Sequence, residues 1–117
     1  MKKYLITNKL YDADLELYIG GKYQDFLKKF PRDDDTEPSD ILGEFVYGRN
    51  KETKNPIRAI WLSKFELRLL VHEMIHYVTN LMDTKGIKHE PRNDEPIAYL
   101  MEFMITECIN KLKWKKK

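Results

Sequence analysis

The sequence predicts one α+β domain, in which a small, mainly antiparallel sheet packs against helices. The chain has 117 residues, which is enough for a single hydrophobic core. Hydrophobic residues make up 42% of it, as is typical of folded proteins, although 34% are charged. Short segments that suit strands come before two longer segments with helical apolar spacing. We therefore treat residues 1–117 as one domain, with residues 1–14 and 115–117 as loosely ordered ends.

The first predicted elements are a strand and a short helix. Residues 15–19 alternate between polar and apolar side chains and end at two glycines, which is typical of a strand. Apolar residues then recur at steps of three and four between Tyr23 and Phe30, and Pro31 follows. This spacing predicts an amphipathic helix that the proline ends.

The next two elements should form a hairpin. Residues 41–47 and 57–62 look like strands, and residues 48–56 would be the loop between them. We expect one of these two strands to lie at an edge of the sheet. The polar segment 32–40, which holds an acidic triplet at 33–35, lacks the glycine and glutamate of a calcium-binding EF-hand loop, so we interpret it as a solvated loop.

A long helix should follow. Ser63 and Glu66 have the spacing of a capping box, and no proline or glycine follows until Gly86, a natural stop. One side of this helix is apolar and is expected to face the core; it comprises Leu67, Leu70, Val71, Met74, Ile75, Val78, Leu81 and Met82. The opposite, polar side comprises His72, Glu73, His76, Thr79, Asn80 and Asp83.

Residues 72–76 read His-Glu-Met-Ile-His, the one stretch that indicates a particular chemistry. Two histidines four apart on a helix project from one face, about 5–6 Å apart at Cβ, so both imidazoles can reach one metal ion. Glu73 is turned aside from the pair and can act on water that the metal activates. This is the H-E-x-x-H pattern of zinc metallopeptidases.

A catalytic zinc usually takes a third protein ligand. The metzincin continuation is excluded, because Thr79 and Met82 stand where it needs glycine and histidine. His89 could bend back from a connecting segment, but such a segment is a poor rigid support. Glu95 begins a second segment with helix-start chemistry and is the better candidate. Glu102, two turns further on, is the fallback.

The C-terminal segment is expected to be a helix from about Glu95 to Trp114. Its apolar residues keep three- and four-residue steps, and Cys108 lies among them as a buried small hydrophobe, which fits a reducing compartment. The lysines that end the chain complement the helix dipole. Because no second basic patch accompanies them, we expect no nucleic-acid partner.

The spacing of His72, Glu73 and His76, followed by Glu95, resembles that of the gluzincins, which include thermolysin-like and aminopeptidase-like zinc peptidases. Residues 70–101 are also similar to small, single-domain zincin-like proteins of bacteriophages and prophages. The resemblance implies a minimal zincin-like domain, with His72, His76 and Glu95 as Zn²⁺ ligands and Glu73 as general base. Larger gluzincins add a Tyr or His that stabilises the oxyanion. No motif here matches it, and Tyr99 is either a substitute or a packed aromatic.

Three classes of function follow from these patterns. The first is a zinc metallopeptidase that acts on a peptide or protein substrate, and the resemblance implies that a phage or mobile element encodes it. The second is a zinc protein without catalysis that serves as a binding or inhibitory module. The third is a metal-free interaction protein. No targeting signal or membrane-spanning stretch is visible in the sequence, so we expect a cytoplasmic protein. The resemblance to phage proteins implies that the cytoplasm is that of a bacterial host cell.

Overall fold

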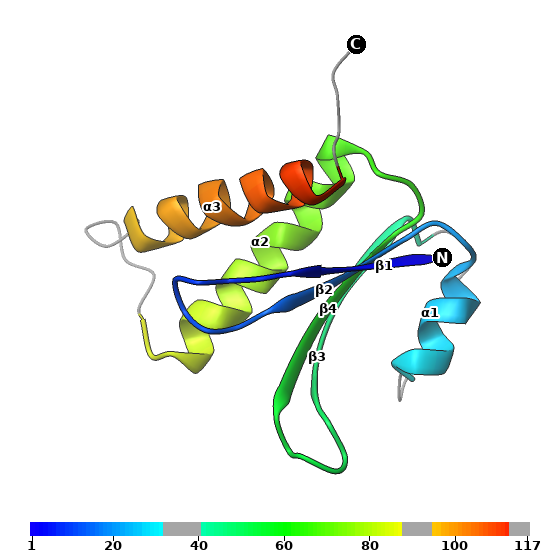
Figure 1. The fold of residues 1–117 in the computed structure, drawn as a ribbon, viewed down its shortest axis with the longest axis horizontal. Helices are drawn as coiled ribbons and strands as arrows, with labels where there is room; N and C mark the ends of the chain where they lie inside the picture. The colour runs from blue at the N-terminus through cyan, green and yellow to red at the C-terminus, as the bar shows by residue number, and fades with distance from the viewer. Residues whose placement is uncertain (32–40, 88–94, 113–117) are drawn as a thin grey trace.

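The computed structural model describes residues 1–31, 41–87 and 95–112. They form four strands and three helices (Figure 1): β1 (Lys2–Ile6), β2 (Leu15–Ile19), α1 (Tyr23–Lys29), β3 (Gly43–Arg49), β4 (Pro56–Leu62), α2 (Leu67–Thr84) and α3 (Glu95–Leu112). The predicted α+β class is confirmed, and so are the strand and short helix of the N-terminal half and the later hairpin. No helix in the described ranges has the length and apolar character needed to cross a membrane.

The four strands form one mixed sheet in the order β1-β2-β4-β3. β1 pairs with β2 and β3 pairs with β4 in antiparallel fashion, whereas β2 and β4 are parallel. β1 lies within residues 1–14, which we expected to be a loosely ordered end and not a strand. Most side chains of β1 are exposed, and its sequence does not alternate between polar and apolar residues. The strand is defined by its backbone pairing with β2. β3 lies at the other end of the sheet order, as the prediction of an edge strand required.

Each face of the sheet carries its own hydrophobic cluster. Alternate side chains of a strand point to opposite faces, so Ile60 and Leu62 of β4 join the larger cluster with α2 and α3. Ala59 and Trp61 point the other way and pack with α1. Helices thus cover both faces of the sheet, and the central strand β4 is buried along most of its length.

The start of α2 differs from the predicted capping box. The helix begins at Leu67, and Ser63 instead continues the strand pairing, since its N–H donates to the carbonyl of Leu42 at 2.9 Å. Glu66 occupies the N-cap position without a side-chain cap, and its carboxylate pairs with Lys64 and Arg68. Tertiary pairing with Leu42, just before β3, therefore overrides the local capping signal.

The end of α2 confirms the predicted stop. Gly86 adopts a φ of +73°, which a residue without a Cβ reaches without strain. Its N–H donates to the carbonyl of Asp83, and the N–H of Ile87 donates to that of Met82. These two bonds form the Schellman arrangement that satisfies the last carbonyls of a helix.

The buried side of α2 is rotated relative to the prediction. Ile75 and Leu67 were placed in the core, but they are 51% and 42% exposed. Glu73 and Tyr77 are buried in their place, at 6% and 0% exposure. The helix packs against both the sheet and α3, and this two-sided contact, which the sequence does not reveal, fixes its rotation about its own axis.

A buried polar network ties α2 to the connection between β1 and β2. The Tyr77 hydroxyl donates to the carbonyl of Ala13 at 2.6 Å and accepts from the Asn8 amide at 2.8 Å. The other end of Asn8 accepts from the backbone N–H groups of Leu10 and Tyr11. All these groups are satisfied, so the network fixes the course of residues 8–13 over the core.

Burial makes the stability of the fold sensitive to alkaline pH. Removal from water raises the pKa of Tyr77 to about 12 and that of the Cys108 thiol, from an ordinary 9.0, also to about 12. Because the pKa values of both groups are higher in the folded state, both groups hold their protons more tightly there than in the unfolded chain. Their contribution to the free energy of unfolding is fully present below the ordinary pKa values and is lost as pH rises towards 12. We expect the free energy of unfolding, measured with urea, to fall between pH 9 and 12, with Cys108 contributing on the order of 2–4 kcal/mol of that fall. Cys108→Ala should show a shallower fall than the unchanged protein; equal slopes would contradict the role of Cys108.

Candidate metal centre

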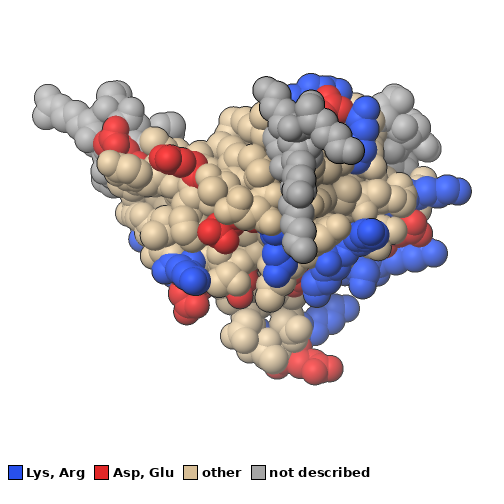
Figure 2. Space-filling model, turned by 45° about the horizontal axis from the view of Figure 1, so that its top comes forward, with Lys and Arg blue, Asp and Glu red and all other residues tan. Residues whose placement is uncertain are grey.

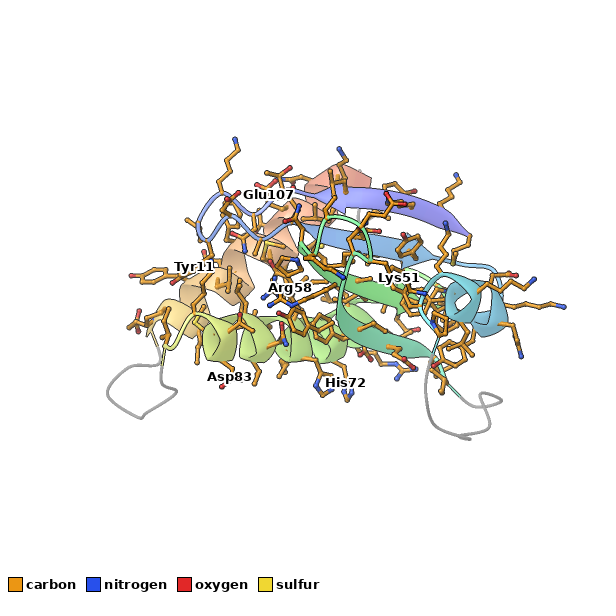
Figure 3. All side chains as sticks on the ribbon, turned by 90° about the horizontal axis from the view of Figure 1, so that it is seen from below. Tyr11, Lys51, Arg58, His72, Asp83 and Glu107 are labelled. Carbon is orange, nitrogen blue, oxygen red and sulfur yellow. The ribbon has the colours of Figure 1, made fainter. Side chains whose placement is uncertain are left out.

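His72 and His76 lie next to one another on the exposed side of α2. Their ring centroids are 5.2 Å apart, as expected of residues one helical turn apart. Both side chains are exposed. Figure 3 shows His72 projecting from α2 on the side of the helix that faces away from the sheet. The pair is therefore accessible from solvent without any rearrangement of the core.

Glu73 points to a different side of the helix and lies beneath the start of β3. The backbone N–H of Phe45 donates to its carboxylate. A Cβ added to Gly43 would lie 3.1 Å from Glu73 Oε2, closer than most such contacts, so a larger residue there would push the carboxylate a few tenths of an ångström away. The prediction from sequence overlooked both strand residues. A glycine inside the expected strand 41–47 was the available signal, since it marks a site where another group comes close.

The surroundings of Glu73 favour a carboxyl group that can accept a proton. Burial away from water raises the pKa of Glu73, and the nearby Glu44 raises it further. His72, His76 and the Phe45 N–H act in the opposite direction and lower this pKa. The desolvation by burial is the largest of these effects. The distance between His72 Nε2 and Glu73 Oε2 is 3.9 Å.

These three residues fit a divalent metal by their chemistry and spacing. One ligand atom from each of His72, Glu73 and His76 lies within 4.8 Å of the other two. Ligands of a tetrahedral zinc, at about 2.1 Å from the ion, are about 3.4 Å apart. The exposed imidazoles would have to rotate towards the carboxylate to close the remaining distance. Imidazole nitrogen with a carboxylate is a donor set that zinc accepts.

A shallow hollow adjoins this group. It has a volume of about 380 Å³ and lies between the start of β3 and the first turns of α2. Its lining comprises Ile41, Leu42, Gly43, Arg68, Leu69, His72 and Glu73. The hollow thus has apolar side chains next to His72 and Glu73. Arg68 also lines it.

Glu95 is not part of the group, although the sequence suggested it as the third ligand. It is exposed and lines a different hollow with Tyr99 and Glu102. α3 runs back along α2, so its first residue lies on the side of the molecule where α2 ends (Figure 1). His76 precedes the last residue of α2, Thr84, by more than two turns, about 12 Å along the axis.

The other residues considered around the site fall elsewhere. Tyr99 is 63% exposed, so its interpretation as a packed aromatic is wrong, and it lies with Glu102 away from the histidine pair. Asp83, the last residue of the predicted polar side, is exposed in the last turn of α2. His89, the acidic triplet at 33–35 and Trp114 lie outside the described residues. Within the ranges that the structure covers, His72, Glu73 and His76 form the one group of three or more potential metal ligands.

The comparisons with known proteins add no relative to this picture. No protein-family model, curated protein or solved structure matches the chain.

Proposed function

We propose that the chain is a zinc-dependent hydrolase that cleaves peptide bonds, with His72 and His76 as metal ligands and Glu73 as general base. The observation that supports this most directly is the difference in environment between the two histidines and the glutamate within about one turn of α2. Two accessible imidazoles face solvent together, while the carboxylate between them is buried and held by the backbone of β3. A surface stripe of polar residues would not require such a buried and oriented carboxylate.

In this proposal the neutral imidazoles of His72 and His76 hold the ion. A zinc ion bound there supplies a Lewis acid that polarises a carbonyl group and lowers the pKa of water. Glu73 accepts the proton of the attacking water and passes it to the leaving amine. Its raised pKa, caused by burial, brings it closer to the working pH, and the Phe45 N–H fixes the orientation of the carboxylate.

The position of β3 favours a peptide as substrate. β3 lies at the end of the sheet order and pairs on one side with β4. Its first residues also contact Glu73. An extended peptide that adds to such an edge gains main-chain hydrogen bonds without a deep pocket. A peptide bound there would pass close to the general base.

A second candidate function is a zinc-binding module without catalysis. It is favoured by one observation: Glu73 itself belongs to the donor group, whereas Glu95 does not. If Glu73 binds the metal, no base remains for the reaction. Such a protein would act by binding a host factor, as a phage-encoded or mobile-element inhibitor in the bacterial cytoplasm does.

Zinc titration of metal-free protein tests the proposal. We expect one zinc per chain by metal analysis and a rise in the melting temperature on the order of 10 °C when zinc is present at about 100 times its Kd. A library of peptides from a digested bacterial proteome should show new termini with zinc and none after chelation. Zinc binding without any cleavage would favour the second candidate. Absence of zinc binding would exclude both.

A further inference from the structure

A second hollow, larger than the one beside the histidines, lies away from the metal centre. It has a volume of about 750 Å³ and lies between α3 and the connection from β1 to β2. Leu10 and Tyr11 of that connection face Tyr99 and Phe103 of α3 across it. Figure 3 shows Glu107 at the top and Tyr11 at the left of the molecule, whereas His72 projects at the bottom. We refer to it as the α3 hollow.

The floor of the α3 hollow is apolar and accessible. Leu10 is 51% exposed and Tyr99 is 63% exposed, which is unusual for large apolar side chains so close together. Apolar surface of this kind on a protein commonly marks a site where another molecule binds. Contact with an apolar or aromatic side chain would remove both residues from water.

The rim of the α3 hollow is acidic. Glu95, Glu102 and Glu107 all line it, and none of them forms an ion pair with any cation in the described part of the chain. Figure 2 shows acidic side chains separated by uncharged surface on the side where α3 begins, whereas Lys and Arg gather towards the opposite side. Three uncompensated carboxylates around an apolar floor complement a ligand that is both basic and apolar.

One wall of the α3 hollow is fixed in advance. The side-chain Oδ1 of Asn8 accepts from the backbone N–H groups of Leu10 and Tyr11 at 3.0 and 3.2 Å. The Nδ2 of the same side chain donates to the buried Tyr77 hydroxyl. The wall is thus anchored to the core through α2. A surface that is already ordered loses little conformational entropy when a ligand binds.

We propose that the α3 hollow binds a basic peptide segment of another protein, in which an aromatic or aliphatic side chain is flanked by Lys or Arg. The apolar side chain lies between Leu10, Tyr99 and Phe103, and the flanking cations pair with Glu95, Glu102 and Glu107. A nucleic acid is disfavoured, because its phosphates would meet the acidic rim. This proposal is independent of the metal centre.

The test uses a fluorescein-labelled peptide KKWLKK and fluorescence anisotropy with the full chain. We expect saturable binding that weakens as salt is raised, and at least tenfold weaker binding of the peptides KKSSKK and EEWLEE. Glu102→Gln/Glu107→Gln should weaken KKWLKK binding about fivefold or more, and Tyr99→Ser should weaken it without loss of the fold, because Tyr99 is exposed. Circular dichroism melts check the fold of each variant.

The controls separate this site from unspecific attraction and from the metal centre. Glu52→Gln/Asp83→Asn removes the same charge from exposed positions elsewhere and should leave peptide binding unchanged. His72→Ala should also leave it unchanged. Equal binding by both double variants, or equal binding of KKSSKK, would overturn the proposal. Self-association of the chain that Tyr99→Ser abolishes would assign the hollow to a second copy instead of a partner and would also overturn it.

Discussion

Replacement of both His72 and His76 by alanine is expected to abolish stoichiometric zinc binding. The two imidazoles are the exposed members of the donor group, and nothing else in the described chain joins it apart from Glu73. Loss of a residue that merely supports a ligand typically lowers metal affinity by about 10- to 100-fold, so loss of two ligands should exceed a hundredfold. Metal analysis should give one zinc per chain before the change and less than about one-tenth afterwards. Because both side chains are exposed, the stability of the metal-free protein should stay within about 0.5 kcal/mol.

Matched variants on the same helix make this result specific. Thr79→Ala/Asp83→Asn alters two exposed residues of α2 outside the donor group and should retain one zinc. Glu95→Gln should retain it as well, since Glu95 lines the α3 hollow. Loss of zinc in the Glu95 variant would mean that α3 changes its position when metal binds. Full zinc occupancy in the double histidine variant would eliminate the site altogether.

Glu73→Gln is expected to retain zinc and to lose hydrolysis. The amide keeps the size of the side chain and can still accept the Phe45 N–H, but it cannot take a proton from water. General-base catalysis typically contributes about 10²- to 10⁴-fold, so cleavage of a sensitive library peptide should fall by at least about a hundredfold. Zinc content and peptide cleavage are measured on the same preparation. Loss of zinc together with activity would make Glu73 a ligand and favour the non-catalytic module.

The same variant should change how the stability of the metal-free protein depends on pH. Burial raises the pKa of Glu73, so the folded state keeps a proton that the unfolded state releases at lower pH. Stability therefore falls as pH rises from the ordinary carboxyl value through the folded-state pKa. Glutamine has no charge to desolvate. Urea unfolding at several pH values should show a flatter profile for Glu73→Gln and a more stable protein above this window.

Local patterns were sufficient for most secondary structure. The strand at residues 15–19, the helix that ends before Pro31 and the hairpin strands near 41–47 and 57–62 all have side-chain periodicity that depends on residues close in sequence. The same is true of the stop at Gly86, where the left-handed conformation favours glycine. The parallel pairing of β2 with β4 was not predictable, because it joins segments separated by a helix and another strand.

One part of the candidate site likewise follows from local sequence, and another part depends on tertiary packing. The spacing of His72 and His76 places both imidazoles on one helical face, because the pitch of an α-helix is the same in every fold. Their neighbour Glu73 has an environment that depends on β3: Gly43 leaves room for its carboxylate, and Phe45 supplies a hydrogen bond. These contacts span about thirty residues of sequence and arise only when the strand and the helix pack.

By itself, the sequence determined the α+β class, the existence of both long helices and the proximity of the two histidines. Only the tertiary structure decided the rotation of α2, the burial of Glu73 and the location of Glu95 at the α3 hollow. The physical reason is the range of the forces involved. Backbone hydrogen bonding and helical pitch act between near neighbours, whereas the relative placement of α2, α3 and β3 follows from the burial of a shared apolar surface contributed by the whole chain.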